Sequence, residues 1–139
     1  MLTDELKDRI RDTYTALMDS KQLTPRWGQR QMIAEIANTL GRIPGPGEGP
    51  AKEPAVCVIE AGTGTGKTIA YAVTAIPMAQ ALGKRLVVAT ATIALQEQFI
   101  YKDLPDIQHH SGLDFTYALA KGRRRYICLS KLDRLLAEG

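Results

Sequence analysis

The apolar residues of the first forty positions recur every three or four residues, which places them on one face of a helix. In the first segment these positions are Leu2, Leu6, Ile10, Tyr14 and Leu17, and in the second they are Met32, Ile33, Ile36, Ala37 and Leu40. Thr3 has the residue type of a helix N-cap, with Asp4 and Glu5 in the first turn. The pattern predicts one helix that ends near residues 19–20 and a second helix over 28–40.

Residues 41–54 interrupt this helical pattern. They contain four glycines and four prolines. Because proline fixes one backbone angle and lacks an N–H, and because glycine has no side chain to pack, this composition predicts a loop. The preceding helices are too small to form a domain alone, so we expect a loop within one domain.

From residue 55 onward the pattern changes to alternating strand and helix segments. The predicted elements cover 55–60, 66–82, 85–90, 93–103, 115–120 and 130–137 in turn, with strands at 55–60, 85–90 and 115–120. The strand segments are continuously apolar, as in strands covered on both faces. The order therefore predicts an α/β fold with a parallel sheet and right-handed crossovers. Pro77 predicts a kink or an early end of the helix over 66–82.

Length and composition set the class of protein. The 139 residues, 45% of them hydrophobic, suffice for one domain with a buried core. No apolar run reaches the length of about 20 residues that a membrane helix needs, and the first residues do not resemble a signal peptide. Two cysteines are too few for a disulfide framework and predict a cytoplasmic protein.

The net charge of +3 is modest, but the basic residues are clustered near the end of the sequence. No acidic residue separates Lys121, Arg123, Arg124, Arg125 and Lys131. This run predicts either contact with nucleic acid or a solvated surface, and composition alone does not decide between them. His109 and His110 have no partner at metal-ligand spacing, so we expect them to be loop residues.

A glycine-rich segment joins the first predicted strand to a helix. Residues 60–68 read Glu60, Ala61, Gly62, Thr63, Gly64, Thr65, Gly66, Lys67 and Thr68. This order of strand, glycine-rich turn, Lys-Thr and helix is that of a phosphate-binding loop. Backbone N–H groups would surround phosphates, Lys67 would contact the β- and γ-phosphates, and the Thr68 hydroxyl would coordinate Mg²⁺. Ala61 stands where the strict motif has glycine, and the alternative is a turn without a ligand.

Two further segments have residue types suited to binding. Arg26 and Gln29 precede the loop, and a glutamine amide, which both donates and accepts, suits an adenine edge. Neutral hydrogen-bonding groups follow the second predicted strand at Thr90, Thr92, Gln96 and Gln98, where a helix N-terminus suits a nucleic-acid phosphate. The alternatives are ordinary surface residues in the first case, and helix capping with solvated glutamines in the second.

The combination of these segments resembles the start of the bacterial DinG helicases, in the iron–sulfur branch of superfamily 2 that includes YoaA and XPD. The resemblance rests on five segments in a fixed order and covers nearly the whole chain except 41–54. These segments are Arg26 to Met32, Glu60 to Thr68, Thr90 to Gln98, Lys102 to Pro105, and Lys121 to Cys128. Ala61 fits this family, whose loops commonly begin with alanine.

The resemblance implies a RecA-like ATP-binding lobe that uses ATP and Mg²⁺ and moves 5′-to-3′ on single-stranded DNA. Arg26 and Gln29 would then belong to a Q-motif that reads adenine, and the segment from Thr90 to Gln98 would contact the DNA backbone. Cys128 would be the first of four cysteines that hold a [4Fe–4S] cluster, and the preceding arginines would approach the DNA.

This interpretation divides the chain into three parts. Residues 1–54 would carry the N-terminal helices, 55–120 part of the ATP-binding lobe, and 121–139 the start of the iron–sulfur region. The sequence contains no Asp-Glu-Ala-His box, so we expect it to bind nucleotide without unwinding DNA alone. The alternatives are a non-catalytic nucleotide- or nucleic-acid-binding module and another phosphate-loop enzyme, such as a small-molecule kinase.

Overall fold

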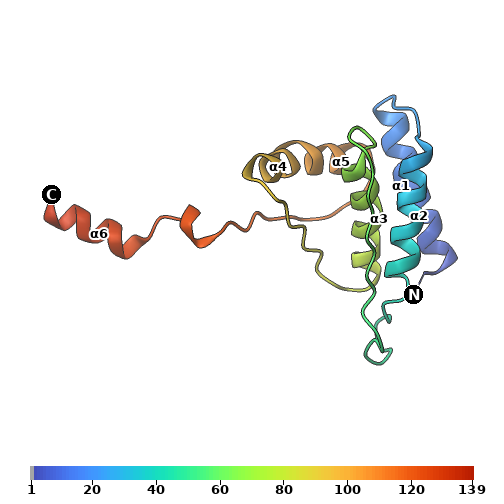
Figure 1. Cartoon of the computed structure of the whole chain (residues 1–139), viewed down its shortest axis with the longest axis horizontal. Helices are drawn as coiled ribbons and strands as arrows, with labels where there is room; N and C mark the ends of the chain where they lie inside the picture. Colours follow the sequence, from blue (N-terminus) through green and yellow to red (C-terminus); the bar gives the residue numbers. More distant parts are fainter. Residues whose placement is uncertain (1) are drawn as a thin grey trace.

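The computed structural model describes residues 2–139, which are helices joined by extended segments (Figure 1). The α-helices are α1 (Asp4–Ser20), α2 (Trp27–Leu40), α3 (Lys67–Ala81), α4 (Ile93–Gln98), α5 (Leu104–His110) and α6 (Leu129–Glu138). A π-helical turn, η1 (Phe99–Asp103), joins α4 to α5, and a 3₁₀ turn, η2 (Arg123–Arg125), precedes α6.

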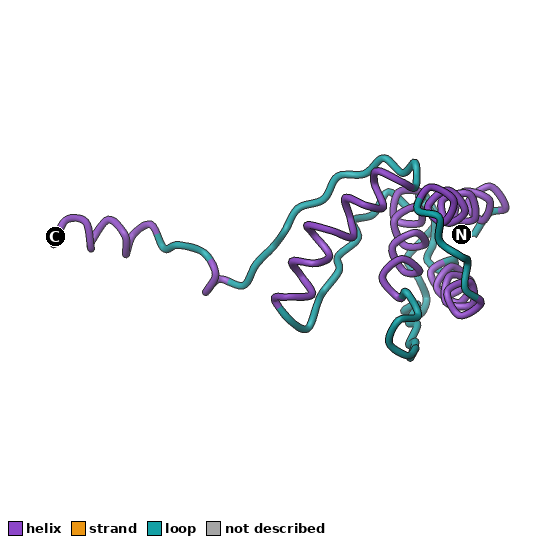
Figure 2. Tube along the Cα trace, turned by 90° about the horizontal axis from the view of Figure 1, so that it is seen from above, coloured by secondary structure: helices purple, strands orange, loops and turns teal. Residues whose placement is uncertain are grey.

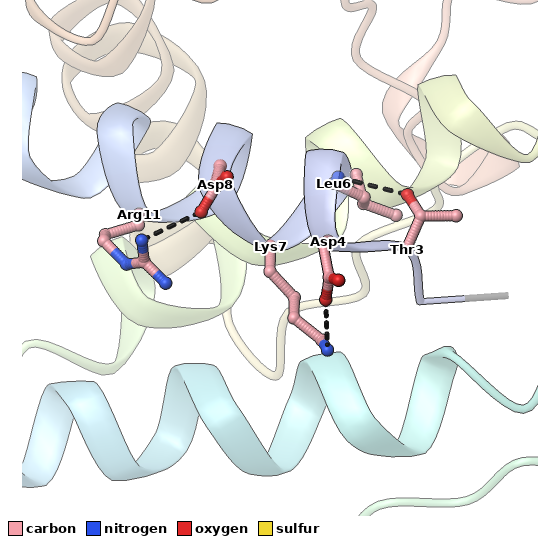
Figure 3. A network of polar contacts seen from close by, with 6 residues as sticks. All are labelled: Thr3, Asp4, Leu6, Lys7, Asp8 and Arg11. Carbon is pink, nitrogen blue, oxygen red and sulfur yellow. Dashed lines mark hydrogen bonds and ion pairs between the residues drawn. The ribbon is translucent and has the colours of Figure 1, made fainter.

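Helix α1 begins as the sequence predicts. The Thr3 hydroxyl accepts a hydrogen bond from the backbone N–H of Leu6 at 3.2 Å, which satisfies one of the free amides of the first turn (Figure 3). Lys7 pairs with Asp4 at 2.9 Å on the exposed side of the helix. The predicted apolar positions of α1 from Leu6 to Leu17 are buried, so this helix and its inward face are confirmed.

The core lies where α1, α3 and α5 meet. It contains Tyr14, Leu17 and Met18 of α1, Ala72, Val73 and Ile76 of α3, and Phe99, Leu104, Ile107 and Leu113 from the later segments. A second cluster joins α1 and α2 to the far end of α3 through Leu6, Ile10, Ala37 and Met78. Helix α3 contributes to both clusters, so it fixes the loop before it relative to α1 and α2.

The predicted α/β fold with a parallel sheet is wrong for this structure. Residues 2–139 contain no strand, and the segments 55–60, 85–90 and 115–120 are extended loops (Figure 2). Their apolar side chains are not covered on both faces, since Val58 is 91% and Val87 79% exposed. The physical reason is that β-branched sequences favour an extended backbone, whereas a strand also needs a neighbour to pair with, which a local pattern does not specify.

The end of one predicted helix differs in the structure. The helix expected over 93–103 corresponds to α4 and η1 and continues directly into α5, so His109 and His110 end a helix and are not loop residues. Pro105 explains the π-helical turn before it, because proline lacks an N–H and its ring crowds the carbonyl four residues earlier. Pro77 does not end α3, which continues to Ala81.

The last helix, α6, lies away from the rest of the molecule (Figures 1 and 2). The sequence offers four leucines of this helix for packing, but all four are exposed: Leu129, Leu132, Leu135 and Leu136. Neither α6 nor any other helix in the described part of the chain has the length and apolar composition needed to cross a membrane.

An ion pair joins the end of α1 to α5. The Lys21 amine donates a hydrogen bond to the Asp106 carboxylate, and this bond lowers the pKa of Asp106 below its ordinary value. Ser20 and His110 form a second contact between the same helices, with 2.7 Å between Oγ and Nδ1. These polar contacts fix α5 against α1 at the edge of the core.

We expect the Lys21–Asp106 pair to make stability depend on acid. Because the pKa of Asp106 is lower in the folded chain, its contribution is present above about pH 4 and is lost as the pH falls through the lowered value. Asp106→Asn should reduce the free energy of unfolding by about 0.5–1 kcal/mol at neutral pH, because the pair is partly exposed. The difference from wild type should vanish in acid.

Urea unfolding between neutral pH and acid measures this dependence. Asp8→Asn is the matched control, because Asp8 pairs with Arg11 within the exposed face of α1. If the free energy of unfolding of Asp106→Asn differs from that of wild type by the same amount at every pH, the Lys21–Asp106 pair is not the source of the acid dependence.

Candidate functional site

The glycine-rich segment forms a tight turn directly before α3. Gly64 and Gly66 have φ values of 78° and 80°, in the left-handed region where glycine avoids the penalty of a Cβ atom. Thr65 closes the turn by donating to the Gly62 carbonyl from its backbone N–H at 3.4 Å and from its hydroxyl at 2.6 Å. Gly66 is the N-cap of α3, so the first free N–H groups of that helix follow the turn immediately.

Lys67 and Thr68 occupy the first turn of α3. The exposed Lys67 amine donates to the carbonyl of Ala61 at 2.5 Å, so it lies across the mouth of the glycine turn. An anion entering the turn would offer this amine a stronger, charge-assisted partner than a neutral carbonyl. The helix dipole adds positive potential at the same place.

The start of α2 contacts the glycine turn from the side. The Arg26 guanidinium donates to the carbonyl of Gly64, and the Gln29 amide donates to the carbonyl of Gly66 at 3.3 Å. A Cβ atom built on Gly28 would lie 3.2 Å from the Thr65 methyl, so the backbone of α2 packs closely against the Thr65 side chain there. The structure therefore brings Arg26 and Gln29 to the loop, where they support its backbone.

The Gln29 side chain is enclosed between the loop and α1. It is 4% exposed, and its carbonyl oxygen accepts a hydrogen bond from the Tyr14 hydroxyl at 2.8 Å. One donor and one acceptor of the amide are thereby used within the chain. An adenine edge would reach this amide only after it became exposed, so the predicted role of Gln29 in reading adenine is not visible in this geometry.

Sequence reasoning missed the polar role of Tyr14. Its spacing marked it as a core position, and it is 5% exposed in the structure. The available signal was its residue type, because a buried tyrosine usually finds a hydrogen-bond partner for its hydroxyl. The sequence pattern also did not single out Trp27, which is largely exposed and follows Arg26 directly.

The segment from Thr90 to Gln98 contains the whole of α4 and the three residues before it. Thr92 caps this helix by accepting from the backbone N–H of Leu95 at 3.2 Å, and the Thr90 hydroxyl donates to the Thr92 carbonyl at 3.3 Å. These contacts are the ordinary capping that the sequence left open as an alternative.

The basic run of η2 lies against α4 through one of its three arginines. Arg125 donates to the Gln96 side-chain oxygen at 2.5 Å and lies 3.9 Å from the Glu97 carboxylate. Gln96 also donates to the carbonyl of Ala120 at 3.4 Å. Arg123 and Arg124 are exposed. The structure thus joins two predicted nucleic-acid segments and leaves two guanidinium groups facing solvent.

An open cavity of about 830 Å³ connects the loop to α4. Lys67 and Thr68 of α3 line it together with Thr90 and Gln98 of the α4 segment. Its remaining walls are mainly apolar, with Met32, Ile36, Leu40, Tyr71 and Phe99 among them. Asp103 is the one carboxylate that lines this cavity in the described part of the chain, and burial raises its pKa.

Cys128 does not lie in a metal-binding cluster. It is exposed at the N-cap of α6, and Cys57 lies in another segment. Residues 2–139 contain no group of three His, Cys, Asp or Glu side chains arranged to hold a metal. Since a [4Fe–4S] cluster takes four ligands and the sequence has two cysteines, this chain does not supply a complete cluster site.

Comparison with known proteins agrees with the resemblance seen in the sequence. The chain is 42% identical over 138 residues to the ATP-dependent DNA helicase DinG of Photobacterium profundum, a match that covers 99% of this chain. It is 41% identical to the protein of that name in Salmonella typhimurium and 40% identical to that of Escherichia coli (strain K12), each over 135 residues. The chain spans 18–19% of the length of these relatives. No protein-family model matches it.

Proposed function

We propose that this chain, which is homologous over nearly its whole length to proteins named DinG helicase, provides the nucleotide-binding part of an ATP-dependent DNA helicase. The complete protein would unwind DNA with 5′-to-3′ polarity by hydrolysing ATP. One observation carries the proposal: Lys67 and Thr68 open α3 behind a glycine turn whose backbone is fixed by Arg26 and Gln29.

In this proposal the chain's own groups bind the triphosphate. The N–H groups of the glycine turn and the first turn of α3 would donate to phosphate oxygens. Lys67 would leave the Ala61 carbonyl for the β- and γ-phosphates, and the Thr68 hydroxyl would turn toward Mg²⁺. Magnesium would neutralise part of the phosphate charge.

We propose that the chain alone binds nucleotide without unwinding DNA. Hydrolysis in phosphate-loop motors needs a further acidic residue on the metal and a group that orients water. The sequence has no Asp-Glu-Ala-His box, and Asp103, the cavity carboxylate, belongs to a π-helical turn. Steady ATP turnover by the purified chain, abolished by Lys67→Ala, would contradict this proposal.

The DNA-binding part of the proposal rests on Arg123 and Arg124. Both are exposed on η2 and have no neighbouring carboxylate among the described ion pairs, so they are free to contact phosphates. Binding to single-stranded DNA would also distinguish a helicase part from a small-molecule kinase. Cys128 lies three residues beyond η2, and its proposed role is limited to one ligand of a cluster in a longer protein.

We expect the three arginines of η2 to differ in their effect on binding of single-stranded DNA. Arg123→Ala and Arg124→Ala should each weaken binding and reduce the slope of log K against log salt by about 0.7, the value for one phosphate contact. Arg125→Ala should change the slope less, because its guanidinium is held by Gln96 and Glu97.

Fluorescence anisotropy with a labelled oligonucleotide, between about 50 and 200 mM salt, measures these slopes. Lys52→Ala is the control, because Lys52 is an exposed cation in the loop over 41–54. Equal slopes for wild type and for the Arg123→Ala/Arg124→Ala double variant would contradict the assignment of this surface to DNA.

A further inference from the structure

Tyr14 connects α1 to the start of α2 through two hydrogen bonds. Its hydroxyl donates to the Gln29 side-chain oxygen at 2.8 Å and accepts from the backbone N–H of Arg26 at 3.3 Å. Tyr14 and Gln29 are both buried. The two residues that it contacts are those that hold the glycine turn, Arg26 at the Gly64 carbonyl and Gln29 at the Gly66 carbonyl.

The direction of these hydrogen bonds fixes the orientation of the Gln29 amide. A tyrosine hydroxyl has one proton to donate. The Arg26 N–H donates to the hydroxyl oxygen, and the hydroxyl proton is directed to the Gln29 side-chain oxygen. The Gln29 NH₂ group then faces the Gly66 carbonyl. The reversed amide would place two acceptors against each other at Gly66.

We propose that Tyr14 is a positioning residue for the phosphate-binding loop. It acts through Arg26 and Gln29, which it holds in the orientation that supports the glycine turn before α3. The loop is therefore fixed from α1 as well as from α2. This inference rests on the proposed nucleotide binding and adds a residue that does not contact the nucleotide.

Tyr14→Phe tests the proposal because it removes the hydroxyl and retains the ring in the core. The dissociation constant for ATP·Mg²⁺, measured by calorimetry, should rise about fivefold to tenfold, the effect of a buried hydrogen bond. Hydrogen exchange should accelerate in the loop over 60–68 and stay unchanged in the second half of α3. A change in core packing alone would not confine faster exchange to the loop.

Two variants serve as matched controls. Tyr101→Phe removes a phenol hydroxyl from an exposed residue, and Ile10→Val trims the core on the same helix as Tyr14. Neither should change nucleotide affinity by more than about twofold. The proposal is overturned if Tyr14→Phe binds ATP·Mg²⁺ as wild type does, or if Ile10→Val weakens binding equally at an equal melting temperature.

A double-mutant cycle with Gln29→Leu keeps the proposal testable even where Tyr14→Phe lowers stability. If Tyr14 acts through Gln29, the effect of Tyr14→Phe on affinity should be smaller in the Gln29→Leu background. Fully additive effects overturn the inference. Its failure differs from failure of the proposed function, in which wild type itself does not bind ATP·Mg²⁺ or Lys67→Ala binds it equally well.

Discussion

Lys67→Ala is expected to abolish the stabilisation of this chain by ATP·Mg²⁺. At a nucleotide concentration of 100 times Kd, wild type should gain about 2.7 kcal/mol, which for a chain of this length corresponds to a rise in Tm of roughly 10 °C. The variant should show almost no rise, because it lacks the cation that lies at the mouth of the glycine turn.

The apo stability of Lys67→Ala should stay close to that of wild type. The side chain is exposed, and its hydrogen bond goes to a backbone carbonyl that water can satisfy instead. Lys84→Ala is the matched control, since Lys84 is an exposed lysine beyond the opposite end of α3. Thermal unfolding with and without ATP·Mg²⁺ measures both variants, and an equal rise in Tm for Lys67→Ala and wild type would refute the assignment of Lys67.

The features that were predictable from sequence are those that neighbouring residues determine. Thr3 and the apolar positions of α1 lie within a few turns of one another, so their pattern was enough to predict the helix, its cap and its buried face. The glycine turn and the start of α3 are equally local, because the left-handed residues and the first helical residue are adjacent.

The features that were not predictable depend on partners far along the chain. Val58 and Val87 have the residue type of strands, but pairing of their segments is a non-local event that does not occur here. The contact of Gln29 with Gly66 spans 37 positions, and its contact with Tyr14 spans 15. The sequence identified the polar residues near the loop, whereas only the structure shows that two of them hold its backbone.

Gly66→Ala is expected to cause the second large effect, on both stability and nucleotide binding. Gly66 has a φ value of 80°, and alanine in this left-handed region costs about 1–2 kcal/mol. A Cβ atom at this position would also lie 2.0 Å from the Gln29 side-chain nitrogen, which is too close for any contact. Gln29 would have to leave the Gly66 carbonyl, which adds about 1–3 kcal/mol for buried polar groups without partners.

Gly83→Ala separates the two causes of this effect. Gly83 has a φ value of 60° and no atom within 4 Å of a built Cβ, so alanine there has the backbone penalty without the collision. Urea unfolding should show a larger loss of stability for Gly66→Ala than for Gly83→Ala. Gln29→Ala should cost less in the Gly66→Ala background than in wild type, because truncating Gln29 there relieves the collision and the hydrogen bond to Gly66 is already lost. Equal losses for the two glycine variants would mean that the close approach of Gln29 to the loop does not contribute to stability. If Gly66→Ala loses more stability than Gly83→Ala and is the one of the two that binds nucleotide more weakly, the contact between Gln29 and Gly66 is the point where α2 fixes the loop before α3.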